Sequence, residues 1–124
     1  MTDFEEIGKE FLSFYYDTFD NNREGLADLY QEESMLTYNG EQFKGQESIL
    51  KKLTGLQFES IQHQLNDYQS HPSLQDSVLV SACGTIFIDK NENGINFSQV
   101  FLLAPVQGSN SYFIYNDIFS LNLN

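Results

Sequence analysis

The chain has 124 residues, including 11 Phe, 7 Tyr and one cysteine, and its 18 acidic and 6 basic residues give a formal net charge of −12. This charge argues against binding to nucleic acid or to an anionic membrane, because both draw on clustered Lys and Arg, but it permits a basic protein partner. The length predicts a single domain, residues 1–124, and no apolar run approaches the ~18 residues of a membrane span.

The first part of the chain predicts helices. Thr2 or Asp3 is the expected N-cap of a helix of residues 4–19, and Asp20-Asn21-Asn22 ends this helix and starts a short second one. Apolar residues at spacings of three and four give the first helix a broad inward stripe: Phe4, Ile7, Phe11, Phe14, Tyr15 and Phe19. The second helix is expected to carry an apolar side formed by Leu26, Leu29 and Tyr30.

A hairpin and a third helix follow. Residues 35–38 predict a short strand, and Asn39-Gly40 is the strongest two-residue signal for a type I′ turn, which needs positive φ at both positions. Residues 41–43 return as the second strand. Residues 46–54 then predict a helix that ends at Gly55.

The second half of the chain predicts four further strands: residues 58–68, 77–89, 95–104 and 112–119. His71-Pro72 is expected to break the first of them. In the last strand, alternation puts Asp117 on one face with Phe113, Tyr115 and Phe119. Neither of the last two strands has a cleanly polar face, which indicates a sheet covered on both sides.

The element order α-α-β-β-α-β-β-β-β predicts an α+β fold, with three helices packed on a curved antiparallel sheet. The long helix would cover one sheet face and form a cone whose apolar mouth lies near Asn39-Gly40, residues 56–61 and the turn of residues 89–94. The chain has nothing left to cover the other face. Because an open apolar face is an interaction patch, we expect an isologous homodimer through it.

The sequence contains no glycine-rich phosphate loop, no paired-cysteine metal spacing and no nucleophile elbow, and we expect no cofactor and no metal. Asp117 is a candidate general base, because a buried carboxylate has a raised pKa. With His63 and Tyr15 it would serve a small-molecule isomerase or dehydratase that uses the cone pocket. In the competing interpretation, Asp117 and His63 are hydrogen-bonded to neighbours within the fold.

Several segments of the chain resemble the nuclear transport factor 2 family. Each segment alone is a weak signal, but together they match the family in order and spacing over nearly the whole chain. They are residues 14–16, 19–23, 34–38, 43–45, 61–63, 97–101 and 116–119. The resemblance implies a cone-shaped homodimer that is a carrier and not an enzyme. It implies binding to the GDP-bound form of the small GTPase Ran and to phenylalanine-rich repeats of nucleoporins. The implied location is the cytoplasm and the nucleus, with a concentration at the nuclear pore.

The resemblance also implies site residues. An apolar cavity would take an aromatic side chain of Ran, at positions matched here by Tyr38, Leu56, Phe58, Ile61, Ile86 and Ile118. An acidic rim would pair with basic residues of Ran. Asp89 matches this rim and Glu92 lies beside it, but Asn39 and Asn91 stand where the family has acids. Phe4, helped by Tyr38, matches the aromatic that the family uses for nucleoporin repeats.

Overall fold

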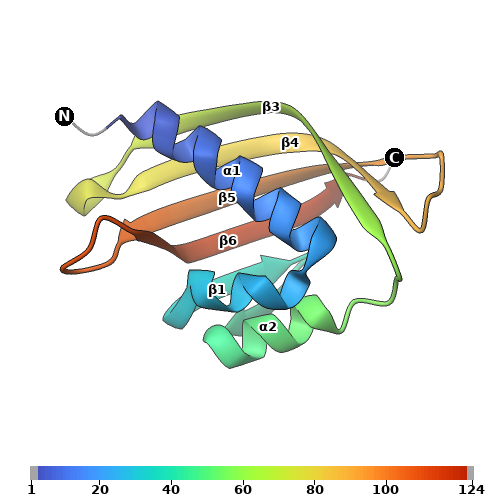
Figure 1. Cartoon of the computed structure of the whole chain (residues 1–124), viewed down its shortest axis with the longest axis horizontal. Helices are drawn as coiled ribbons and strands as arrows, with labels where there is room; N and C mark the ends of the chain where they lie inside the picture. Colours follow the sequence, from blue (N-terminus) through green and yellow to red (C-terminus); the bar gives the residue numbers. More distant parts are fainter. Residues whose placement is uncertain (1–2, 123–124) are drawn as a thin grey trace.

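The computed structural model describes residues 3–122, which form helices on one side of a six-stranded sheet (Figure 1). The elements in chain order are α1 Phe4–Asn21, the 3₁₀ helix η1 Arg23–Leu29, β1 Tyr30–Tyr38, β2 Glu41–Lys44, α2 Gln46–Thr54, β3 Ile61–Pro72, the 3₁₀ turn η2 Leu74–Asp76, β4 Val78–Ile88, β5 Ile95–Pro105 and β6 Tyr112–Asn122. Within this described part, none of the helices is long and apolar enough to cross a membrane.

The strand order is β2-β1-β6-β5-β4-β3, so β1 and β6, far apart in sequence, are neighbours in the interior of the sheet. Figure 1 shows α1 lying across the curved sheet and α2 beside β1 on the same side. This arrangement confirms the predicted α+β cone. The β1–β6 pairing is parallel, however, and only the other described pairings follow the predicted antiparallel pattern.

Helix α1 begins as predicted and covers the inner sheet face. The Asp3 carboxylate caps it by accepting a hydrogen bond from the Glu6 N–H at 3.1 Å, whereas Thr2 lies outside the described residues. The buried stripe of α1 is formed by Gly8, Leu12, Tyr15, Tyr16 and Phe19. The inward prediction for Phe14 is wrong, since its side chain is 54% exposed. Successive helical residues are about 100° apart, which puts Phe14 outside a stripe centred on Leu12 and Tyr16.

The hairpin and α2 form where the local signals placed them. Asn39 and Gly40 have φ values of 49° and 89°, as a type I′ turn requires, and α2 has the predicted bounds. Strand β1 begins much earlier than expected. Tyr30, which was assigned to a helix, is its first residue, because it pairs with Ile114 of β6.

Strand β3 passes through the predicted break and pairs Pro72 with Val78 of β4. An edge strand tolerates a proline when its missing N–H falls on the free side, and β3 is an edge of the sheet. Strand β6 contains a bulge, because Leu102 pairs with Asn116 while Leu103 pairs with Ile114. The bulge turns Tyr115 outward, to 41% exposure, so the prediction that it shares a face with Asp117 is wrong.

The two faces of the sheet differ in burial. The face under the helices contributes most of the strand residues of the buried core, among them Val80, Ile86, Phe97, Phe101 and Ile114. On β4, buried and exposed positions alternate from Val78 to Cys83, so that Leu79 and Cys83 lie on the outer face.

Candidate functional site

At the wide end of the cone, the carboxylate of Asp89 links two neighbouring loops. Oδ1 of Asp89 accepts hydrogen bonds from the backbone N–H groups of Glu59 and Ser60, at 2.8 and 2.9 Å, and the Asp89 N–H donates to the Ser60 carbonyl at 2.9 Å. These bonds join the turn after β4 to the loop before β3, as the predicted mouth requires. A groove lined by residues 56–60 with Asp89 and Lys90 lies between them.

Arg23 is a residue of this end that the sequence reasoning missed. Its guanidinium carbon lies 4.5 Å from the centre of the Phe58 ring and 5.7 Å from that of Phe19, and Nη1 donates to the Leu53 carbonyl at 3.1 Å. These contacts hold Phe58 at the mouth by a cation–π interaction. The available signal was a cation directly after the end of α1 in a chain with few basic residues.

The tip of the first hairpin forms another side of this end. The Tyr38 ring stacks on Phe119, with centroids 4.6 Å apart, and the Lys52 Nζ lies 5.3 Å from the Tyr38 centroid. Burial raises the pKa of the Tyr38 hydroxyl. Lys52 also reaches Glu41 Oε1 at 3.5 Å. Tyr38 is therefore anchored between the core and a lysine.

The two asparagines that replace family acids have local hydrogen-bond partners. Asn39 Oδ1 accepts from the Leu121 N–H at 2.8 Å, which ties the hairpin to the end of β6. Asn91 Oδ1 accepts from the Asn93 N–H at 2.9 Å, within the turn between β4 and β5. Both side chains thus shape the backbone at the rim. The exposed acids at this end include Asp89, Glu92, Glu41 and Glu59, the last of which the sequence reasoning did not single out.

The predicted cavity residues do not all meet. Leu56 and Phe58 are partly buried, and Ile61 and Ile86 belong to the core at 7% and 2% exposure. Ile118 is 49% exposed, whereas its neighbours Asp117 and Phe119 are buried. Because side chains alternate along β6 at this point, Ile118 lies on the outer face of the sheet and away from the mouth.

Asp117, the candidate general base, is fully buried in a hydrogen-bonded network. Oδ2 accepts from the Tyr30 hydroxyl at 2.8 Å and the Tyr15 hydroxyl at 3.4 Å, while Oδ1 accepts from Gln99 Nε2 at 2.8 Å. Gln99 Oε1 in turn accepts from the Tyr16 hydroxyl at 2.9 Å. Burial raises the pKa of Asp117 to about 6, although these hydrogen bonds oppose it. Burial also raises the pKa values of Tyr15 and Tyr30.

His63 is paired elsewhere. Its Nδ1 lies 2.6 Å from Asp20 Oδ1, its backbone N–H donates to Asp20 Oδ2 at 2.9 Å, and its ring stacks on Tyr16 at 4.7 Å. The pair fastens the end of α1 to β3. The enzyme alternative therefore joins Asp117 to Tyr15 but leaves His63 with another partner, and a substrate reaches the fully buried Asp117 only if the core opens.

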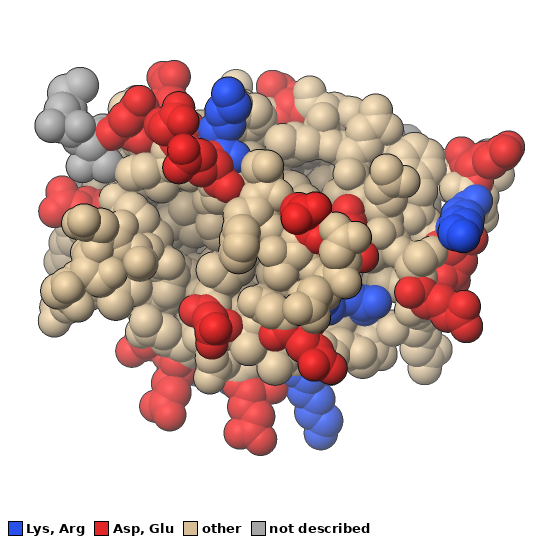
Figure 2. All heavy atoms as spheres, in the orientation of Figure 1, with Lys and Arg blue, Asp and Glu red and all other residues tan. Residues whose placement is uncertain are grey.

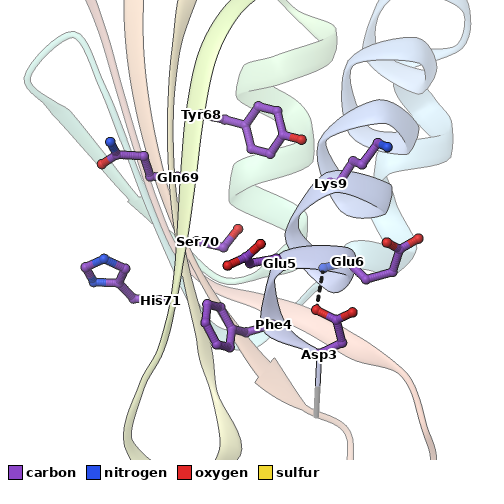
Figure 3. Close-up of a pocket in the computed structure, with 9 residues that line it drawn as sticks. All are labelled: Asp3, Phe4, Glu5, Glu6, Lys9, Tyr68, Gln69, Ser70 and His71. Carbon is purple, nitrogen blue, oxygen red and sulfur yellow. Dashed lines mark hydrogen bonds between the residues drawn. The ribbon is translucent and has the colours of Figure 1, made fainter.

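A second hollow lies at the other end of the molecule, between the first turn of α1 and β3 (Figure 3). Phe4, Tyr68, Ser70 and His71 are among its lining residues. The 18 residues of α1 separate Phe4 from the mouth by about 27 Å, at 1.5 Å per residue. The predicted nucleoporin pair, Phe4 and Tyr38, is therefore not brought together within one chain.

The surface charge is predominantly acidic. Figure 2 shows acidic side chains spread over the side that carries the helices, with few basic ones between them. No group of three or more His, Cys, Asp or Glu residues within residues 3–122 is placed to hold a metal ion. The arrangement fits a surface that meets a basic partner.

The comparisons with known proteins cover nearly the whole chain. The model of the nuclear transport factor 2 domain matches residues 7–121. The chain is 42% identical over 125 residues to nuclear transport factor 2 of Emericella nidulans, covering 100% of this chain and 99% of that protein. The structure of nuclear transport factor 2 from Cryptosporidium parvum matches with a TM-score of 0.91 and 39% identity, covering 96% of this chain and 94% of that one.

A more distant structure shares the fold alone. It is a putative dehydratase of the nuclear transport factor 2-like family from Streptomyces avermitilis, with a TM-score of 0.81, 17% identity and coverage of 98% of this chain and 97% of that one. The closer relatives match in sequence as well as in fold, and over the full chain. The chain belongs to the nuclear transport factor 2 family.

Proposed function

We propose that this protein is a nuclear transport carrier that binds Ran in its GDP form and phenylalanine-rich nucleoporin repeats, and so brings Ran into the nucleus. The observation that carries the proposal is the full-length similarity, at 42% identity, to a protein named nuclear transport factor 2. In this proposal the carrier moves between cytoplasm and nucleus and concentrates at the nuclear pore.

The wide end of the cone is the proposed Ran site. An aromatic side chain of Ran would enter beside Leu56 and Phe58, which are only partly buried. Asp89 and Glu92 would then face basic residues of Ran. Complementary charge at the rim mainly sets orientation and the rate of association, while the apolar contact supplies affinity. Asn39 and Asn91 would contribute through the rim backbone that their side chains hold.

The hollow beside Phe4 is the proposed site for nucleoporin repeats. Phe4 and Tyr68 offer partly exposed aromatic rings, against which a phenylalanine side chain can pack. A contact of this size is weak, and weak binding suits passage through the pore. The proposed homodimer would double the sites and raise the overall avidity. Tyr38 would assist Phe4 only if a second subunit brought the two together.

Calorimetric titration against Ran loaded with GDP and, separately, with a non-hydrolysable GTP analogue tests the proposal. We expect heat of binding with the GDP form and none with the GTP form. Equal binding to both forms would contradict the carrier function, because the cargo would not be released where Ran is loaded with GTP. Binding to neither form would remove Ran as the partner.

A further inference from the structure

The hollow between α1 and β3 has a carboxylate between two aromatic rings. In Figure 3, the Phe4 ring lies toward one end of the hollow and the Tyr68 ring toward the other, and Glu5 points into the space between them beside Ser70. Tyr68 is 37% exposed, and Glu5 is exposed as well. The hollow is therefore open to solvent. Its lining also includes the charged residues Asp3, Glu6 and Lys9, but in Figure 3 the carboxylate that lies between the two rings is that of Glu5.

Glu5 has no ion-pair partner within residues 3–122, where the ion pairs are Lys52–Glu41 and His63–Asp20. Lys9 lines the hollow one helical turn further on, but its ammonium points away from Glu5 in Figure 3. Glu6, the next residue of α1, also lines the hollow, but in Figure 3 its carboxylate points away from Phe4 and Tyr68. Glu5 is thus the one acid of this turn that is directed at β3 in this view.

We propose that this hollow binds a lysine or arginine side chain that lies next to the aromatic residue of its ligand. The carboxylate of Glu5 would accept a charge-assisted hydrogen bond from the cation. The rings of Phe4 and Tyr68 would add cation–π attraction, which favours an ammonium or guanidinium group near an aromatic face. The proposal rests on the proposed function, in which Phe4 contacts aromatic repeats, and adds which repeats are preferred.

Glu5 and Glu6 supply a matched pair of variants. Glu5→Gln and Glu6→Gln change the net charge equally and lie in the same turn of α1, so any effect on helix stability or on the long-range field is shared. The ligands are three synthetic peptides with one phenylalanine-containing core and lysine, glutamine or glutamate next to the phenylalanine. Dissociation constants for each protein and peptide pair are measured by NMR titration.

We expect the lysine peptide to bind the wild-type protein about threefold more tightly than the glutamine peptide, as for a partly exposed ion pair, and the glutamate peptide to bind most weakly. In Glu5→Gln, the three peptides should bind with equal affinity, and the affinity for the glutamine peptide should equal that of the wild type. In Glu6→Gln, the order of affinities should be that of the wild type. Equal losses in the two variants would overturn the proposal, because a diffuse field would then explain the preference.

The failure of this proposal can be distinguished from that of the proposed function. If all three peptides bind the wild type equally and Phe4→Ala weakens each of them, the cation preference is wrong and the aromatic site stands. If none of the peptides binds the wild type, both the cation preference and the nucleoporin site are overturned. A preference for lysine that survives in Glu5→Gln also rejects the role given to Glu5.

Discussion

At the residue scale, Asp117 shows how a carboxylate can be both buried and satisfied. Each of its oxygens accepts at least one hydrogen bond, from Gln99 on one side and from Tyr15 and Tyr30 on the other. The network joins α1, β1, β5 and β6. A fully satisfied network of this kind specifies how these elements pack, although burial of the charge costs stability.

This cost makes the stability dependent on pH. The pKa of the Asp117 carboxyl is about 6 in the folded protein, against an ordinary value of 3.8. Between these two pH values the folded protein binds more protons than the unfolded chain, so the folded protein loses stability as the pH rises through the folded pKa. Asp117→Asn removes this titration. We expect its free energy of unfolding, relative to wild type, to rise by about 2 kcal/mol between about pH 4 and about pH 7. Urea unfolding curves at both pH values check this, and parallel changes in the two proteins would contradict it.

Asp89 combines a structural and a binding role, and its variants separate them. Asp89→Asn keeps an oxygen that can accept from the Glu59 and Ser60 N–H groups but removes the charge. We expect affinity for Ran-GDP to fall about threefold, a change typical of a partly exposed charge, with no change in melting temperature. Asp89→Lys, which removes the acceptor and reverses the charge, should weaken binding further.

Calorimetry and thermal melts measure both effects. Asp76→Asn is the control, because Asp76 is an exposed acid beyond the opposite end of the 11-residue β4, about 36 Å from Asp89. Asp89 has no place in the rim if its asparagine variant binds as tightly as wild type. A loss of the same size in Asp76→Asn would assign the effect to net charge alone.

At the element scale, the curvature of the sheet depends on Gly84 of β4. Strand β3 contains an irregularity between Leu65 and Asp67, next to the point where Leu65 pairs with Gly84. A Cβ at position 84 would lie 2.1 Å from the Gln64 carbonyl oxygen and 3.1 Å from Phe97 Cε1. The bend of β3 toward β4 therefore needs a residue without a side chain here.

We expect Gly84→Ala to lower the free energy of unfolding by about 2 kcal/mol, since a backbone oxygen and a buried ring must both move. Ser81→Ala is the control, because Ser81 is exposed on the outer face of the same strand. Urea unfolding of both variants measures the difference. Equal stability of Gly84→Ala and Ser81→Ala would mean that β3 can shift without cost.

The sequence predicted the elements that are fixed by local chemistry and missed those fixed by pairing. Asn39-Gly40 and the bounds of α2 follow from φ preferences and helix stop signals, which neighbouring residues supply. The bulge at Tyr115 has no such signal, because no glycine or proline marks it in the sequence of β6 and only the register with β5 reveals it. Tyr30 likewise enters β1 only because Ile114 is opposite.

The candidate site also has parts that local sequence predicts and parts that depend on contacts between distant residues. The groove of residues 56–60 with Asp89 was predicted, because the loops that form it lie at the ends of predicted strands. The contact of Arg23 with Phe58 depends on how η1 is placed after α1, which no local pattern fixes. Ile118 was assigned to the cavity by similarity alone, although alternation with Asp117 and Phe119 already placed it on the opposite face.

At the scale of the whole molecule, no helix among residues 3–122 covers the outer face of the sheet. Leu79 is 38% exposed and pairs with Leu102 of β5, and Val100 pairs with Ile118 of β6. The helices in Figure 1 lie on the other side of the sheet. Adjacent apolar side chains on three strands form the kind of patch that a second copy of the chain can cover through a two-fold axis.

Light scattering tests whether this face forms a homodimer. We expect the wild type at micromolar concentration to have twice the mass of the 14.3 kDa chain. Leu79→Glu should have the mass of one chain, because a dimer would bury two uncompensated carboxylates. Phe14→Glu is the control, since Phe14 is an exposed apolar residue on the helical side and should leave the dimer intact. A single-chain mass for the wild type would reject the dimer, and with it the avidity proposed for nucleoporin repeats. If both variants lost half their mass, the interface would have to include α1 instead of the open sheet alone.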